Sequence, residues 1–172
     1  IAVYGNRAYD DGLIQLKDTA ELCGFNVIAS VAAVAEHSIM RQFGSARPDE
    51  EDSKELKKFA EEILEKLSSD EELSTDYFVP GNHEYKRLGN LNVVPKASAS
   101  CTGCGKCADA CPTGAINKNN IRTGDSSKCI SCMGCIAACP KGIRKLNPVF
   151  LAAASLKMKN LLSGRKPNEI FL

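Results

Sequence analysis

CTGCGKCADACPTGAI, at residues 101–116, recurs as CISCMGCIAACPKGIR at residues 129–144, a shift of 28 residues. Seven of the sixteen aligned pairs are identical, and the two stretches hold eight of the nine cysteines of the chain. Each stretch has the spacing C-x₂-C-x₂-C-x₃-C followed by a proline. A repeat this short predicts two half-modules around one shared core, because neither half buries enough apolar surface alone.

This spacing resembles that of bacterial two-cluster ferredoxins, in which cysteine thiolates ligate [4Fe–4S] clusters. The fourth cysteine of each run there ligates the cluster of the other run. That crossing rule predicts one cluster on Cys101, Cys104, Cys107 and Cys139, and a second on Cys129, Cys132, Cys135 and Cys111. We further expect glycines 103, 105 and 134 to form the tight ligand loops, and isoleucines 116, 121, 130, 136 and 143 to shield the clusters. Residues 115–124, between the runs, are predicted to form a small hairpin.

Zinc and disulfide bonds are the alternatives for such a cysteine-rich stretch. Zinc sites pair two separated C-x₂-C knuckles, which leaves the third and fourth cysteine of each run unexplained. Disulfides require an oxidising compartment, whereas a free Cys23 and two cluster motifs are typical of a reducing one. The sequence therefore favours iron–sulfur ligation and a cytoplasmic location.

Charge is divided unevenly along the chain, although the net charge is only +1. Residues 1–95 contain 10 Lys and Arg against 18 Asp and Glu, a net charge of −8, and residues 96–172 contain 12 against 3, a net charge of +9. The basic part is expected to bind the acidic part of this chain or an acidic redox partner. Nucleic acid is not expected, because the positive charges are scattered and no aromatic platform accompanies them. No stretch is long and apolar enough for a transmembrane helix, and a membrane-surface role for the C-terminal helix is a minor alternative.

The first half has the pattern of an α/β domain. Apolar residues at 1–4 and 25–35 predict strands, and periodic patterns over 11–23 and 49–67 predict helices, in the order typical of a parallel sheet. Cys23 is expected on the core face of the first helix, and the acidic run 49–52 is expected to be a solvated helix start. Two strands cannot cover both edges of such a sheet, so preceding strands are expected before Ile1.

YGNRAYDD, at residues 4–11, follows the first strand at the edge where open α/β sheets bind ligands. It resembles the second flavin-contacting loop of flavodoxins, with Gly5 and Asn6 in the turn and Tyr9 in the position that stacks on the flavin ring. The phosphate-binding loop of that family has no counterpart in this sequence. FMN binding is therefore an expectation that needs the preceding half of the domain. The alternative is an ordinary strand-to-helix turn.

The chain as a whole resembles the C-terminal portion of fusion proteins that join a flavodoxin-like domain to a two-cluster ferredoxin. The resemblance rests on the cysteine runs, YGNRAYDD, AEHSI at 35–39, VPGN at 79–82 and GRKPNEIFL at 164–172. It implies part of a flavodoxin-like α/β domain at 1–95, an α+β ferredoxin domain with two [4Fe–4S] clusters at 96–147, and a helical extension at 148–172.

The resemblance further implies electron transfer between a donor or acceptor protein and a flavin. The alternatives are the electron-input module of a flavin-dependent oxidoreductase, and clusters that only stabilise a fold. A carrier without its own catalysis is favoured, and the sequence does not settle whether the protein is an enzyme. His37 and His83 are expected to be hydrogen-bonded structural residues.

Overall fold

The computed structural model describes residues 1–69, 73–87 and 93–172. It divides into two compact units. Unit 1 comprises Ile1–His37, Arg41–Arg87 and Lys159–Leu172, and unit 2 comprises Ser38–Met40 and Leu88–Met158. The predicted linker near residue 95 falls in unit 2, and its residues 91 and 92 lie outside the described residues.

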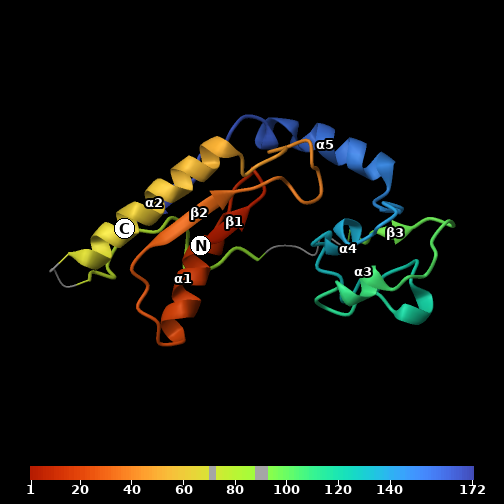
Figure 1. Cartoon of the computed structure of the whole chain (residues 1–172), viewed down its shortest axis with the longest axis horizontal. Coiled ribbons are helices and arrows are strands. Elements are labelled where there is room, and N and C mark those ends of the chain that lie inside the picture. The colour runs from red at the N-terminus through yellow and green to blue at the C-terminus, as the bar shows by residue number, and fades with distance from the viewer. Residues whose placement is uncertain (70–72, 88–92) are drawn as a thin grey trace. The chain divides into compact units, whose positions relative to one another are not determined.

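Unit 1 is built on a three-stranded sheet with the order β1-β2-β5, of which Figure 1 labels the neighbouring strands β1 and β2. β1 (Ala2–Tyr4) pairs in parallel with β2 (Ser30–Val34), as the strand–helix–strand order predicts. All five residues of β2 are buried, whereas Phe25, the predicted start of this strand, is exposed. β5 (Glu169–Phe171) pairs antiparallel with β2, so the end of the chain completes the sheet. The sequence did not predict β5, because three residues carry no readable alternation.

Helix α1 (Gly12–Leu22) connects β1 to β2 and covers the sheet with its first turn. Leu13 and Ile14 are buried there and form a core cluster with Ala32 and Val79. The helix ends before Gly24, whose φ of +87° fits the predicted C-terminal cap. The predicted core face is wrong at its far end, because Cys23 is exposed. The helix therefore packs through residues near its start, and its last turn projects away from the core.

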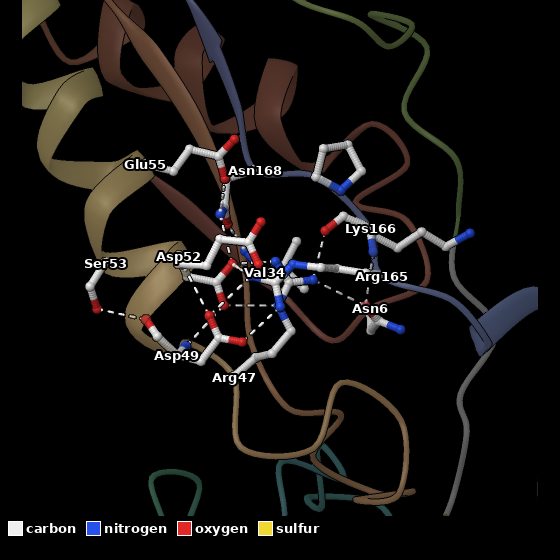
Figure 2. Close-up of polar contacts among 12 residues, drawn as sticks. Asn6, Val34, Arg47, Asp49, Asp52, Ser53, Glu55, Arg165, Lys166 and Asn168 are labelled. Atoms are coloured by element: carbon white, nitrogen blue, oxygen red, sulfur yellow. Dashed lines mark hydrogen bonds and ion pairs between the residues drawn. The ribbon is translucent and has the colours of Figure 1, made fainter.

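Helix α2 (Glu50–Ser68) begins with a capping box between Asp49 and Asp52. The prediction that this acidic run is simply solvated is wrong, because Asp52 is fully buried. Arg47 donates to Asp52 through Nε at 2.9 Å and through Nη2, and the two side chains form a buried ion pair (Figure 2). The arginine, placed two residues before the predicted helix start, explains how a carboxylate can be buried there.

The C-terminal segment closes this polar cluster. Asn168 donates to Asp52 at 2.9 Å and to Glu55 at 2.6 Å, and its side-chain oxygen accepts from the backbone N–H of Val34 at 2.8 Å (Figure 2). Arg47 also donates to the carbonyl of Lys166 at 2.6 Å. These bonds tie residues more than 100 positions apart in the sequence, and they fix β5 against β2.

Unit 2 contains little regular structure. β3 (Lys96–Ala97) pairs antiparallel with β4 (Arg144–Lys145), and two four-residue helices, α3 (Lys106–Asp109) and α4 (Gly134–Ala137), lie between them in the chain. The predicted hairpin at 115–124 is wrong: a 3₁₀ turn, η1 (Lys118–Asn120), occupies this place. Asn117 caps the turn by accepting from the backbone N–H of Asn119 at 2.8 Å, which favours the turn over strand pairing.

Helix α5 (Pro148–Leu162) confirms the helix predicted near residues 149–162. Its residues up to Met158 belong to unit 2, and those from Lys159 belong to unit 1. In the described ranges, no helix has the length and apolar character needed to cross a membrane.

Candidate metal centre

The two cysteine runs fold into matching loops. α3 and α4 occupy equivalent positions of the repeat, and each is preceded by a residue in the left-handed region: Gly105 (φ +82°) and Met133 (φ +62°). Gly103 (φ +71°) and Ser131 (φ +55°) form a second matched pair. The left-handed conformation is therefore a property of the loop, which the second run adopts without glycine. Gly134, predicted to form a tight turn, is simply the first residue of α4.

The cysteines gather around two cavities. The first is lined by Cys129, Cys132 and Cys135 of the second run together with Cys111 of the first run. The second is lined by Cys101, Cys104, Cys107 and Cys139, and so again takes three cysteines from one run and the fourth from the other. The space free of protein atoms is similar in the two cavities, about 390 and 360 Å³ when the solvent at their openings is included. Their similar size follows from the internal repeat.

Apolar side chains complete both cavity walls. Ile116 and Ile130 line the first cavity, and Ile121 and Ile143 line the second. Ile136, the fifth isoleucine expected there, lines neither cavity. Ile116 is 7% exposed and restricts water there, whereas Ile130 is 63% exposed, so the expected shielding of the first cavity comes from Ile116 rather than from Ile130.

The fourth cysteine of each run lies in a turn that directs N–H groups at its sulfur. Burial raises the pKa of Cys111, but hydrogen bonds from Thr113, Ala115 and Ile116 outweigh it and hold the pKa below its ordinary value. The Ala115 nitrogen lies 3.3 Å from the Cys111 sulfur. The backbone N–H groups of Arg144 and Ile143, with weaker contributions from the same turn, lower the pKa of Cys139. Both turns therefore favour the thiolate, the form that ligates metal.

Glycines with φ near +60°, Gly114 and Gly142, shape these two turns. Pro112 and Pro140 precede them directly after the fourth cysteine. A side chain at either glycine would meet no atom within 4 Å, so the glycine is needed for its backbone conformation rather than for space.

Among the residues that the structure describes, Arg144 is the one charged residue that lines both cavities, and the sequence did not single it out. It is 1% exposed. Burial raises the pKa of Cys135, and Arg144 acts against that rise while Cys129, Cys132 and Cys107 add to it. A signal was present in the repeat, whose last aligned pair sets Arg144 opposite the apolar Ile116.

The residues present fit an iron–sulfur cluster. All nine cysteines lie in the described residues and none forms a disulfide. Within these residues, no three His, Cys, Asp or Glu side chains are close enough to hold a single metal ion. The thiols instead surround cavities, as a group of several atoms with thiolates on its corners requires. Four sulfurs at about 2.3 Å from one zinc ion would lie close enough to one another to form a group of the kind that holds a single metal ion.

The three predicted flavin contacts lie in unit 1 and differ in their surroundings. Asn6 is 2% exposed, and its side chain donates to the carbonyls of Leu162 at 2.7 Å and Gly164 at 3.0 Å. A side chain at Gly5 would approach the Cα of His37 to 3.0 Å, so the turn is tightly packed. The Asn6 side chain is thus engaged within the protein.

Tyr9 lines an open hollow beside the β1 end of the sheet. The hollow is also lined by Tyr4, Arg7, Pro80, Lys166 and Glu169, among others. The rings of Tyr4 and Tyr9 contact edge to face, with centroids 5.3 Å apart. Burial, with the Glu169 carboxylate beside it, raises the pKa of Tyr9 to about 12. Of the three predicted residues, Tyr9 is the one whose side chain faces a hollow.

The two histidines are part of the hydrogen-bonding structure. His83 contacts the Asp18 carboxylate at 2.7 Å through Nδ1, and its side chain is largely exposed. Burial lowers the pKa of His37, and its backbone N–H donates to the carbonyl of Phe43 at 3.0 Å. Neither residue lies in the walls of the cysteine cavities.

A comparison with protein families gives a match over residues 94–140 to the family described as 4Fe-4S dicluster domain. This match covers both cysteine runs and supports a ferredoxin-type iron–sulfur domain with an electron-transfer role and at least one [4Fe–4S] cluster. No curated protein and no solved structure matches the chain.

Proposed function

We propose that the chain is an electron-transfer protein that holds two [4Fe–4S] clusters, one in each cysteine cavity. The observation that carries this proposal is the pair of four-cysteine cavities, each lined by three cysteines of one run and the fourth of the other. A bound cluster supplies reversible one-electron transfer. The chain supplies eight thiolates, apolar walls that restrict water, and turns whose N–H groups stabilise negative charge at Cys111 and Cys139.

Anaerobic reconstitution should load about eight irons per chain, as two four-iron clusters require. The crossed arrangement is tested by pairs of substitutions, scored by the number of intact four-iron clusters in reduced EPR spectra. Cys111 and Cys132 line the same cavity, so Cys111→Ala and Cys132→Ala together should leave one cluster intact. Cys104 lines the other cavity, so Cys111→Ala with Cys104→Ala should leave none.

The opposite pattern, with one cluster surviving Cys111→Ala and Cys104→Ala, would show that each run binds its own cluster. Tight zinc binding without iron uptake would overturn the proposal altogether. Loaded clusters that resist reversible reduction would reduce their role to stabilising the fold.

For the electron partner, we propose a flavin held by a flavodoxin-like domain to which unit 1 belongs. The open hollow lined by Tyr4 and Tyr9 supports this, because it lies beside the end of a parallel strand, where such sheets bind ligands. An aromatic ring contributes about 0.5–1.5 kcal/mol of stacking beyond area burial, which is too little to hold FMN alone. The use of this flavin in a substrate-converting oxidoreductase is the second candidate, and it would need a substrate site.

Flavin fluorescence titration tests whether a flavin is the electron partner. We expect weak or no FMN binding by residues 1–172 and tight binding by a chain extended before Ile1. In the extended chain, Tyr9→Ala should weaken FMN binding up to about tenfold, corresponding to roughly 1.4 kcal/mol. Tyr77→Ala is the matched control, since Tyr77 packs on the same core but does not line the hollow. Equal losses in both variants, or no binding by the extended chain, would leave residues 4–11 as a structural turn.

A further inference from the structure

Arg144 has two nitrogens with partners and one without. Nη1 donates to the carbonyl of Pro95 at 2.7 Å, and Nη2 donates to the carbonyl of Ile121. Nε is buried and has no hydrogen-bond partner among the described residues. An unsatisfied buried N–H is destabilising, and more so when the group is charged, so it calls for an explanation.

The charge of Arg144 is equally unbalanced within the described part of the chain, where it forms no ion pair with a carboxylate. Burying an unpaired charge is expensive, and two neutral carbonyls offset only part of that penalty. Packing does not require an arginine here. The repeat places Ile116 at the equivalent position, where it is 7% exposed and lines one cavity.

The place of the guanidinium supplies the explanation. Arg144 lines both cysteine cavities, and its backbone N–H is among the groups directed at the sulfur of Cys139. Iron–sulfur sites with thiolate ligands carry negative charge, and reduction adds one more electron. A buried positive charge shared by both cavities would therefore have its counter-charge in the ligated sulfurs.

We propose that Arg144 is a positioning and tuning residue for both clusters, which donates its Nε–H to a sulfur in a cavity and raises both reduction potentials. This inference rests on the proposed two-cluster function. The positive charge favours the more negative, reduced form, and the low dielectric of the interior strengthens the effect. The purely structural alternative is that Arg144 only ties the Pro95 and Ile121 carbonyls together.

The test is a potentiometric titration of the reconstituted protein, followed by EPR, for Arg144→Ile, Arg144→Gln and Arg144→Lys. Arg144→Ile copies the residue at the equivalent position of the repeat and removes the charge. We expect the potentials of both clusters to fall, with a change of about tenfold or more in the redox equilibrium constant, which is about 59 mV for one electron. Arg144→Lys should retain most of the wild-type potential, because it retains the charge.

Lys145→Met is the matched control, since Lys145 is the exposed neighbour of Arg144 in β4. Its effect should be less than twofold and should vanish at 1 M salt, whereas the effect of Arg144→Ile should persist, because a buried charge is little screened. If Arg144→Ile fails to assemble, Arg144→Gln gives the same charge removal while keeping an amide donor for a carbonyl.

Unchanged potentials in a charge-removing variant that holds both clusters would overturn the inference and leave Arg144 a structural tie. Equal shifts in Arg144→Lys and Arg144→Gln would do the same, because charge would then not be the cause. Failure of the wild-type chain to take up two clusters would instead contradict the proposed function, so the two failures are distinguishable.

Discussion

Arg47 in unit 1 and Arg144 in unit 2 are both buried, with exposures of 8% and 1%, yet their surroundings are opposite. Arg47 faces the fully buried carboxylate of Asp52, and each of its three guanidinium nitrogens has a partner (Figure 2). Arg144 has two neutral carbonyls and a nitrogen with no partner among the described residues. A charge balanced inside the protein indicates a structural role, whereas one without a balancing group indicates a role toward something bound.

The largest effect expected from this comparison is the loss of the Asp52 charge. Asp52→Asn leaves Arg47 buried without a counter-charge, so unit 1 should lose about 3–5 kcal/mol of stability. Tyrosine fluorescence during denaturant unfolding measures this loss selectively. The chain has four tyrosines and no tryptophan, and Tyr4, Tyr9, Tyr77 and Tyr85 all belong to unit 1.

Asp49→Asn is the control for this substitution. Asparagine preserves the helix cap, and the Asp49 side chain is 40% exposed, so the expected loss of stability is much smaller than that of Asp52→Asn. Cluster number and potentials should remain unchanged in both variants. An Asp52→Asn protein as stable as wild type would show that the buried pair does not hold unit 1 together.

Acid should weaken unit 1 through the same pair. Hydrogen bonds from Arg47 are the main cause that lowers the pKa of Asp52, while burial opposes them. A folded-state pKa below the ordinary value near 3.8 means that this stabilisation is complete above about pH 5 and is lost as pH falls through that value toward the folded pKa. Wild-type unit 1 should therefore lose stability more steeply between pH 5 and pH 3 than Asp52→Asn does.

The same tyrosine signal measures this pH dependence, and it reports on unit 1 even where acid disrupts the clusters. Asp11, Asp18 and Asp49 also have lowered pKa values, so the variant should keep a shallower slope rather than none. Parallel slopes for the two proteins would assign the acid sensitivity to these other carboxylates instead.

The features that the sequence predicted well depend on residues close together in the chain or on the internal repeat. The grouping of thiols expected from the cysteine spacing matches the lining of the two cavities, whereas cluster ligation by these thiols remains a prediction. The helices at 12–22, 50–68 and 148–162 follow from apolar periodicity, caps and proline. The flavodoxin-like part and the FMN site remain predictions.

What the sequence could not reveal depends on contacts between distant segments. Asp52 looked like one member of an acidic helix start, and its burial depends on Asn168, 116 residues later. β5 owes its existence to pairing with β2 rather than to its own three residues. Arg144 looked like one more basic residue in a basic half, although its alignment with Ile116 marked a core position. Aligning the two halves of a repeat can therefore reveal a buried charge that composition hides.

An arginine that is paired but exposed gives the smallest effect and completes the comparison. Arg165 donates to Asp49 at 2.7 and 3.0 Å and to Asp52 at 3.0 Å, and its side chain is 40% exposed. Hydrogen bonding to Asp49 raises the pKa of Arg165, so it stays charged at any ordinary pH. Because water and salt screen an exposed pair, Arg165→Met should destabilise unit 1 much less than Asp52→Asn does.

The salt dependence of stability distinguishes the exposed pair of Arg165 and Asp49 from the buried pair of Arg47 and Asp52. Denaturant unfolding followed by tyrosine fluorescence should give an Arg165→Met effect that fades between 0.1 M and 1 M salt, whereas the Asp52→Asn effect should persist. Lys54→Met is the control, because Lys54 is 75% exposed and pairs with Glu50 across one helical turn, a contact worth about 0.3–0.5 kcal/mol. An Arg165→Met loss as large and as salt-resistant as that of Asp52→Asn would mean that Arg165 and Arg47 neutralise Asp52 as one unit. Arg47 alone would then not balance the charge of Asp52, and Arg144 would have to be compared with the pair of Arg47 and Arg165.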